Sequence, residues 1–457
     1  MRTPLLATVA LVLASTAARA DDTHYQDYVL GGRGSGIGGA YAAIADDPSG
    51  IFYNPAGLVD SHKTTVDVET SLYGLELNFR RNNPPNLSEL RQFSPADLEV
   101  IPSDAGAVYG FGTRSPQGAP LALGFDVAVP SYHSSSVHQT TGSATGDFAS
   151  FQRTVLDRTL QAAIGGAYRL NPLWSFGLSA VSLIRTYTQA EEITFRSTDS
   201  FRNTTANVSF ENVSLRAVAG AKLTWGTWLF GAALGTPTVK IQERGSVDLV
   251  EAYRGPNSGL DTKGGLVELS PGTSVGSETV EPLFLRAGVA HYKPRAWTVS
   301  AQATFHLPTT YERFVVNAPD DASAQLAARD LQIPSHVSRS AILDVNLGYD
   351  MLVYEHYSFA FGAFTDFSSA PALTTLPGSD QLAPGSSRLT NVNLYGVTVA
   401  GGFIGPNSLT RFGLTVSYGQ GEDVVASQLV PDRNLVYERV LVGEVFGYAF
   451  ISSTFRY

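Results

Sequence analysis

The stretch "NVSLRAVAGAKLTW", residues 212–225, alternates between apolar and polar side chains along its length. Every odd-numbered position from Val213 to Trp225 is apolar, whereas the even-numbered positions include Arg216 and Lys222. Successive side chains of a β-strand point to opposite faces, so this period of two predicts a strand with one apolar and one polar face. The same alternation recurs in the stretches 296–308, 340–350 and 410–419.

Fourteen segments of this kind follow one another along the chain. The expected strands are 64–79, 104–113, 119–130, 150–169, 173–187, 207–225, 228–240, 282–292, 296–308, 340–350, 356–367, 389–403, 410–419 and 443–457. Most are long enough for a tilted strand that crosses a bilayer, which takes about 9–11 residues. The sequence therefore predicts an all-β fold, either a large soluble protein or an outer-membrane barrel.

The connections between these strands alternate in length. Short links such as Gly226–Thr227 are each followed by a long polar link. The long links are expected at 80–103, 131–149, 188–206, 241–281, 309–339, 368–388 and 420–442. An outer-membrane barrel has an even number of antiparallel strands, short periplasmic turns and long outer loops. This alternation favours a 14-stranded antiparallel transmembrane β-barrel, with both chain ends on the periplasmic side.

The N-terminal residues 1–20 are typical of a secretory signal peptide. Arg2 precedes the apolar run Leu5–Leu13, and Ala18-Arg19-Ala20 forms an A-x-A cleavage pattern. No apolar run of about 18 residues follows, so a transmembrane helix is not expected. We therefore expect an exported protein that resides in the bacterial outer membrane.

Aromatic residues lie where a barrel would need them. Tryptophan occurs at Trp174, Trp225, Trp228 and Trp297, each beside an expected short turn. Indole rings favour the boundary between membrane and water. The chain ends in the aromatic Tyr457, which resembles the C-terminal signal of outer-membrane barrels.

The overall composition excludes several partners. The chain carries 31 basic and 41 acidic residues, a formal net charge of −10, which argues against nucleic acid. It has no cysteine, so disulfides and a lipid-anchored cysteine are both excluded. The eight histidines are scattered, so neither a metal site nor a cofactor is expected.

A glycine-rich stretch, "GGRGSGIGGAYAAIADDPSGIFYNPAGL", spans residues 31–58 and contains G-x-G-x-x-G. A nucleotide-binding loop needs a strand before the glycines and a long helix after them, and 40–45 is too short for that helix. Glycine also permits tight turns and close backbone approach. We therefore expect residues 21–60 to form a compact segment without strands, folded into the lumen.

This stretch resembles the N-terminal hatch of the FadL/TodX family of outer-membrane transporters for long-chain fatty acids and other hydrophobic compounds. The residues that carry the resemblance, and the expected gating motif, are Gly38, Gly39, Asp46, Asp47, Asn54, Pro55, Ala56 and Gly57. The resemblance implies a hatch over 21–60 that plugs a barrel over 61–457. An ordinary surface turn is the alternative interpretation of the Asn-Pro-Ala-Gly motif.

The resemblance also implies a function, namely passive uptake of fatty acids or aromatic hydrocarbons. The ligand would bind in the lumen and leave sideways into outer-membrane lipid after the hatch moves, and a monomer is expected. Related short barrels of secretion systems share a similar hatch. A barrel that does not transport, with a role in secretion or assembly, is therefore the alternative.

Several side chains are expected to face the lumen by parity. The possible ligand contacts are Arg216, Arg286, His306, Phe446, Tyr448 and Phe450. Ion pairs with acidic lumen residues such as Asp344 and Glu444 explain the cations equally well, and His306 can simply be solvated. Gly272–Gly276 matches G-x-S-x-G, but it lies in a long loop without the strand and helix that a serine hydrolase needs. No catalytic residue is predicted, and the chain is not expected to be an enzyme.

Overall fold

The computed structural model describes residues 23–457, except for several short ranges. The ranges outside the description are 62–63, 73–75, 81–99, 113–118, 143–147, 198–199, 255–260, 270–274, 313, 317–335, 388 and 430–434. The predicted signal peptide also lies outside it. Within the described part of the chain, no helix is long and apolar enough to cross a membrane.

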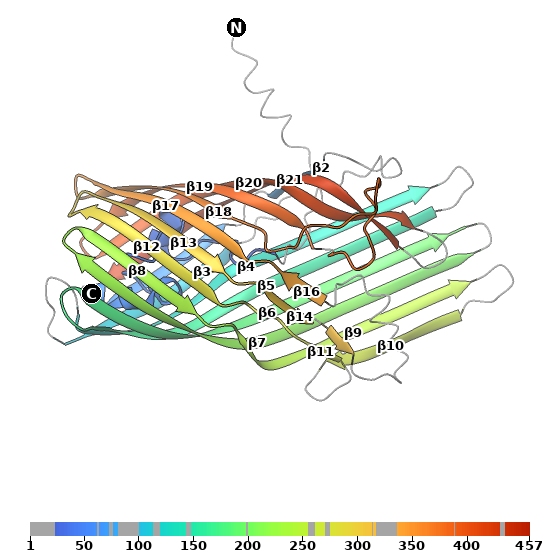
Figure 1. Ribbon diagram of the computed structural model, residues 1–457, viewed down its shortest axis with the longest axis horizontal. Helices are drawn as coiled ribbons and strands as arrows, with labels where there is room; N and C mark the ends of the chain where they lie inside the picture. Colours follow the sequence, from blue (N-terminus) through green and yellow to red (C-terminus); the bar gives the residue numbers. More distant parts are fainter. Residues whose placement is uncertain are drawn as a thin grey trace, which may run out of the picture.

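The described residues form a closed barrel whose neighbouring strands are antiparallel (Figure 1). Its strand segments are β1 (Thr65–Leu72), β2 (Glu76–Arg80), β3 (Val100–Phe111), β4 (Leu121–Gly142), β5 (Phe148–Arg169), β6 (Trp174–Arg196), β7 (Phe201–Trp225), β8 (Trp228–Gly235), β9 (Val239–Arg254), β10 (Asp261–Leu269), β12 (Phe284–Lys293), β13 (Trp297–His306), β17 (Ile342–Val353), β18 (Tyr357–Asp366), β19 (Asn391–Ile404), β20 (Ser408–Leu429) and β21 (Leu435–Arg456). The first and last segments, β1 and β21, pair and close the sheet.

These segments make fourteen barrel strands, as the sequence predicts. Three strands are interrupted: β1 is continued by β2, β8 by β9, and β10 by β12. The break between β8 and β9 contains Pro237, which cannot donate a backbone hydrogen bond to the ladder. Two small sheets, β11 (Val275–Ser277) with β15 (Phe314–Val316) and β14 (Thr309–Glu312) with β16 (His336–Arg339), lie outside the barrel ladder.

The prediction of long loops is wrong in four ranges. The ranges 131–149, 188–206, 241–281 and 420–442 consist largely of strand, because β4 to β7, β9, β20 and β21 run well past the expected ends. In Figure 1 the cyan to yellow-green strands β4 to β7 and β9 extend beyond the others at the end opposite the C-terminus. Beyond the bilayer a strand needs no apolar outer face, so the period of two disappears from the sequence while the ladder of backbone bonds continues.

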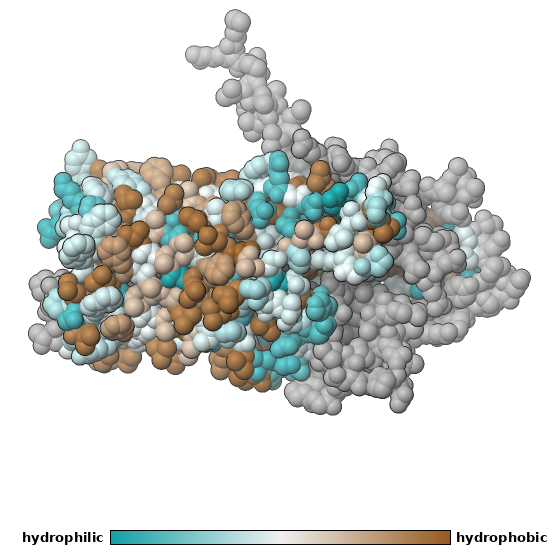
Figure 2. Space-filling view, viewed as in Figure 1, coloured by the Kyte–Doolittle hydropathy of each residue, from teal (hydrophilic) through white to brown (hydrophobic). Residues whose placement is uncertain are grey.

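The outer face of the barrel is apolar where lipid would surround it. Leu178 of β6, Ile164 of β5 and Leu414 of β20 are between 54% and 67% exposed. Figure 2 shows apolar residues gathered over the half of the barrel nearer the short turns. Trp225 and Trp228 flank the tight turn at the end of this band, as interfacial indoles do.

The described part of the N-terminal segment, residues 23–60, is the hatch. It contains α2 (Gly32–Gly36), α3 (Gly50–Tyr53) and the 3₁₀-helix η1 (Pro55–Asp60). One side of the hatch, α2, packs against β1 and β18 to β21, while η1 packs against β4 to β7. Most of its side chains are buried, so the segment fills the barrel interior.

Candidate functional site

The hatch and the wall meet with their backbones almost in contact. A Cβ atom at Gly362 of β18 would lie 2.2 Å from the backbone nitrogen of Gly38. A Cβ atom at Gly231 of β8 would lie 2.2 Å from the carbonyl oxygen of Ala42. Gly38 and Gly39 have φ angles of 60° and 80°, a region that other residues rarely adopt. Glycine residues in both the wall and the hatch therefore permit the two backbones to approach this closely.

The Asn-Pro-Ala-Gly motif forms the start of η1. The Asn54 side chain is fully buried; its Oδ1 accepts from the Ala56 N–H, and its Nδ2 donates to the carbonyls of Ala42 and Ala221. The residue is extended, with φ −162° and ψ 98°, as the residue before proline prefers. Pro55 occupies the first helical position. Asn54 thus joins two parts of the hatch to strand β7.

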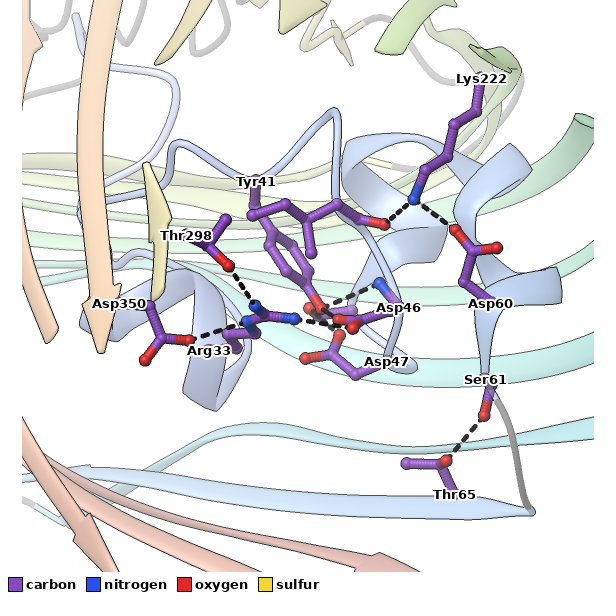
Figure 3. Close-up of polar contacts among 12 residues, drawn as sticks. Arg33, Tyr41, Asp46, Asp47, Asp60, Ser61, Thr65, Lys222, Thr298 and Asp350 are labelled. Atoms are coloured by element: carbon purple, nitrogen blue, oxygen red, sulfur yellow. Dashed lines mark hydrogen bonds and ion pairs between the residues drawn. The ribbon is translucent and has the colours of Figure 1, made fainter. Parts of the chain in front are cut away.

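An ion-pair network ties the hatch to the wall (Figure 3). Arg33 donates to Asp46 at 2.7 Å and to Asp350 of β17 at 3.1 Å, and Asp350 also accepts from Arg411 of β20. The Tyr41 hydroxyl donates to Asp46 at 2.8 Å. Burial alone would raise the pKa of Asp46, but Arg33 and other nearby cations outweigh it and hold that pKa below its ordinary value.

Lys222 makes a second link at the base of the hatch. Its Nζ atom lies 2.5 Å from Asp60 and donates to the carbonyl of Ile44 (Figure 3). Arg169 also bonds Asp60. A carboxylate of the hatch therefore neutralises Lys222.

A cavity of about 100 Å³ lies between the hatch and the wall. It brings together three of the expected ligand contacts, Arg216, Arg286 and His306. Arg216 pairs with Glu281 at 2.7 Å. Arg286 donates to the carbonyls of Phe52 and Tyr53 and to Thr304.

Aromatic rings surround these cations. The guanidinium of Arg286 lies 4.9 Å from the ring centre of Phe284 and 5.2 Å from that of Tyr53. The His306 ring stacks on Tyr25 at 4.2 Å. The cavity therefore combines aromatic surface with two arginines. Its lining also contains four acids, namely Asp27, Glu281, Asp344 and Asp366.

The three expected contacts in the last strand lie elsewhere. Tyr448 and Phe450 are almost fully buried beneath the hatch, and Tyr28 packs edge-on against Phe446 and Tyr448. The Tyr448 hydroxyl accepts a hydrogen bond from the backbone N–H of Val29. These rings support the hatch and do not line the cavity around Arg286.

The regular strand pairing of the wall is interrupted beside this cavity. The sequence analysis did not predict this interruption. Strand β4 pairs with β3 only as far as Ala128, and its register with β5 shifts between Ala128 and Ser131. Pro130 lies in that shift and lines the cavity. Its carbonyl accepts the backbone N–H groups of Asp27 and Tyr28 at 2.9 and 3.0 Å. A proline inside a strand is a recognisable sign of such a bulge.

A second small cavity lies further out along the same wall. Its lining includes Asp157 and Arg185, which are paired through two guanidinium nitrogens and both carboxylate oxygens. Further along β5 and β6, Arg153 pairs with Glu191 at 2.9 Å. The inner face of the extended strands β5 and β6 is therefore charged at these positions, but each acid is paired with an arginine.

Ser274 of the G-x-S-x-G match lies outside the described residues. His306 stacks on Tyr25 and lines the cavity. In the described ranges no three His, Asp or Glu side chains are placed to hold a metal ion.

A closed barrel whose lumen is filled by its own N-terminal segment defines a class of outer-membrane channel. Residues 11–324 match the family model described as "Outer membrane protein transport protein (OMPP1/FadL/TodX)", and the chain belongs to that family. The protein is therefore an outer-membrane protein of a family of channels for hydrophobic compounds.

Solved structures share the fold. The CymD monoaromatic hydrocarbon channel is 12% identical, with 95% of this chain and 99% of that chain covered and a TM-score of 0.57. A Pseudomonas aeruginosa FadL homologue is 13% identical, with the same coverage and TM-score. The Pseudomonas putida toluene transporter TodX is 13% identical, covers 94% and 98%, and has a TM-score of 0.53. No match was found among curated protein sequences.

Proposed function

We propose that the protein takes up hydrophobic carboxylates, such as long-chain fatty acids, passively across the outer membrane. The ligand binds in the cavity beside Arg286, the hatch moves, and the ligand leaves sideways into the bilayer. The observation that carries this proposal is the position of the cavity, between the hatch and the wall break at Pro130. Sideways release keeps an apolar ligand out of water, where exposure costs about 25 cal/mol per Å² of apolar surface.

The N-terminal end of the hatch is suited to control this exit. The backbone N–H groups of Asp27 and Tyr28 bind the Pro130 carbonyl, which has no partner in the β-ladder. A shift of this segment would break both bonds and uncover the gap beside β4. The movement itself is part of the proposal.

The choice of a carboxylate over a neutral hydrocarbon rests on Arg286. Its side chain bonds to carbonyl oxygens, one hydroxyl and ring faces, and no carboxylate pairs with it among the described residues. A buried cation is costly without a counter-ion, and a ligand headgroup could supply one. The names of the similar structures include both a FadL homologue and toluene transporters, so they do not decide the cargo.

The test is uptake by cells that lack their own transporter and express this protein. We expect oleate uptake above that of empty-vector cells, and we expect Arg286→Gln to lower it roughly tenfold, as loss of a charged hydrogen bond would. Toluene uptake should change less than about twofold. Arg244→Gln, which removes an exposed arginine paired with Glu211, is the matched control.

Two outcomes would contradict the proposal. If an inserted barrel accumulates neither ligand faster than empty-vector cells, transport is wrong and a role in secretion or assembly becomes the better hypothesis. If Arg286→Gln reduces oleate and toluene uptake equally, the carboxylate contact is wrong.

A further inference from the structure

Four acidic side chains lie together on the inner face of three neighbouring strands. The pairing register places Asp67 of β1 opposite Gly106 of β3, and Gly106 opposite Asp126 of β4. In the next inward-facing row, Glu69 of β1 lies opposite Asp104 of β3. Strands are about 4.8 Å apart, so these carboxyl groups are close neighbours. Each is at most 1% exposed.

The hatch covers this group and adds a fifth carboxyl. A Cβ atom at Gly106 would lie 2.7 Å from Cγ of Asp126 and 2.8 Å from Cβ of Pro48 in the hatch. Asp47, the residue before Pro48, is also buried and accepts a hydrogen bond from Ser49. We call Asp47, Asp67, Glu69, Asp104 and Asp126 the carboxyl cluster.

The hydrogen bonds in the cluster require protons on the acids. The Ser35 hydroxyl lies 2.6 Å from the Val29 carbonyl and 2.8 Å from Glu69 Oε1, and its single proton cannot fully serve both acceptors. A protonated Glu69 that donates to Ser35 satisfies both contacts. Asp104 and Asp126 lie close together on adjacent strands. No side-chain donor among the described residues bonds either carboxyl, although the backbone N–H of Val127 lies near Asp126. Two ionised carboxylates cannot bond each other, because neither has a donor.

The nearby cations are engaged elsewhere. Arg33 bonds Asp46 and Asp350, and Arg411 bonds Asp350. Two further cations lie near Asp46, namely Arg456, which is exposed, and Lys222, which pairs with Asp60. Two arginines and two other aspartates therefore balance, and no cation in the described part of the chain forms an ion pair with the five acids of the cluster.

The other titratable neighbours are neutral hydroxyl groups. Tyr41, Tyr53 and Tyr448 face the cluster from the hatch and from β21, and burial raises the pKa of Tyr41 and Tyr53. Burial, with Asp46 close by, also raises the pKa of Asp47. A metal ion is a weaker explanation, because no three acids in the described residues are placed to ligate one.

We propose that the carboxyl cluster is a proton-binding site that holds the hatch in its seat. The seated hatch requires protons shared among Asp47, Asp67, Glu69, Asp104 and Asp126, and loss of those protons releases it. This proposal rests on the proposed hatch movement. It adds a regulator, namely the proton concentration.

The sign of the pH effect follows from linkage. When the hatch leaves, the wall acids meet water and return to an ordinary pKa near 4, so the released state binds fewer protons than the seated state. The seated state is therefore most stable in acid and loses stability as pH rises above about 4. Each proton of difference changes the ratio of the two states about tenfold per pH unit.

The experiment measures channel opening in planar bilayers with the purified protein. We expect the frequency of opening events to rise at least tenfold from about pH 5 to about pH 8. In the variant Asp104→Asn/Asp126→Asn this rise should become smaller, because two of the five acids of the cluster can no longer ionise. The control Asp380→Asn removes an exposed acid outside the cluster, which pairs with Arg439, and it should keep the wild-type rise.

Three results would overturn the proposal. The first is an opening frequency that does not rise with pH, including a channel closed at every pH. The second is a pH response in the double variant as large as that of the wild type. The third is a response to Ca²⁺ or EDTA in place of pH. Uptake in cells, measured separately, shows whether transport itself fails. A pH-independent opening with intact uptake would reject the proton site and leave the proposed function standing.

Discussion

Asn54 is the single residue on which the hatch depends most. Its side chain makes three hydrogen bonds in a fully buried site, so Asn54→Ala leaves two carbonyls and one N–H without that partner. Each unsatisfied buried group costs about 1–3 kcal/mol. We expect the barrel to insert normally, with unchanged heat-modifiable gel mobility, while hydrogen exchange in residues 38–60 accelerates and uptake falls.

A matched control is available in the wall. Asn203 lies on the outer part of β7 and donates hydrogen bonds to Glu192 and Thr194 of β6. Asn203→Ala removes these bonds at a site where β7 pairs with β6 and not with the hatch. It should leave exchange in the hatch unchanged. Normal uptake by Asn54→Ala would reject the gating role, and failure to insert would assign the motif to folding.

At the level of single residues, the sequence predicted local geometry better than partners. The extended backbone of Asn54 follows from Pro55, and the positive φ of Gly38 follows from glycine itself. The contact with Ala221 spans 167 residues of sequence, and no local pattern encodes it. The carboxyl cluster was missed for the same reason, since its members alternate correctly on separate strands but meet only through the register.

Among the elements, the membrane-spanning strands were predictable and their outer extensions were not. Apolar alternation marks a strand only where one face meets lipid, so β20 was expected to end near 419 but continues to Leu429. The role of the inward-facing glycines of the wall was also not predictable from the sequence. Their role is visible only when the hatch lies against them.

Those glycines give a prediction for the hatch as an element. In Gly362→Ala the new Cβ atom would lie 2.2 Å from the backbone nitrogen of Gly38. A backbone atom cannot rotate away as a side chain can. We expect an inserted barrel with a displaced hatch, seen as increased conductance in planar bilayers. Gly447→Ala adds the same methyl group in β21, where the nearest atom is 3.4 Å away, and should conduct like wild type. Equal conductance of both variants would mean that the hatch is not seated on this glycine.

For the whole molecule, insertion should depend on the apolar outer band. Leu178 in β6 is 61% exposed on the lipid side. Leu178→Arg should destabilise the inserted barrel by about 2–4 kcal/mol if it lies near the bilayer centre. Folding into lipid vesicles under urea titration measures this change. Asn203→Arg, on the outer extension of the wall, is the control, and an equal loss in both variants would contradict the assigned membrane band.

The tall side of the wall also affects what reaches the cavity. Strand β7 has 25 residues, about 80 Å of extended chain, and at a tilt near 40° it still rises far above an apolar band of about 25 Å. A solute that approaches from outside the cell therefore touches this inner face before it reaches the cavity. Because acids there, such as Asp157 and Glu191, are each matched by an arginine, an arriving anion meets little repulsion, although the chain as a whole is negative. The wall can thus serve as an electrically neutral landing surface for negatively charged solutes.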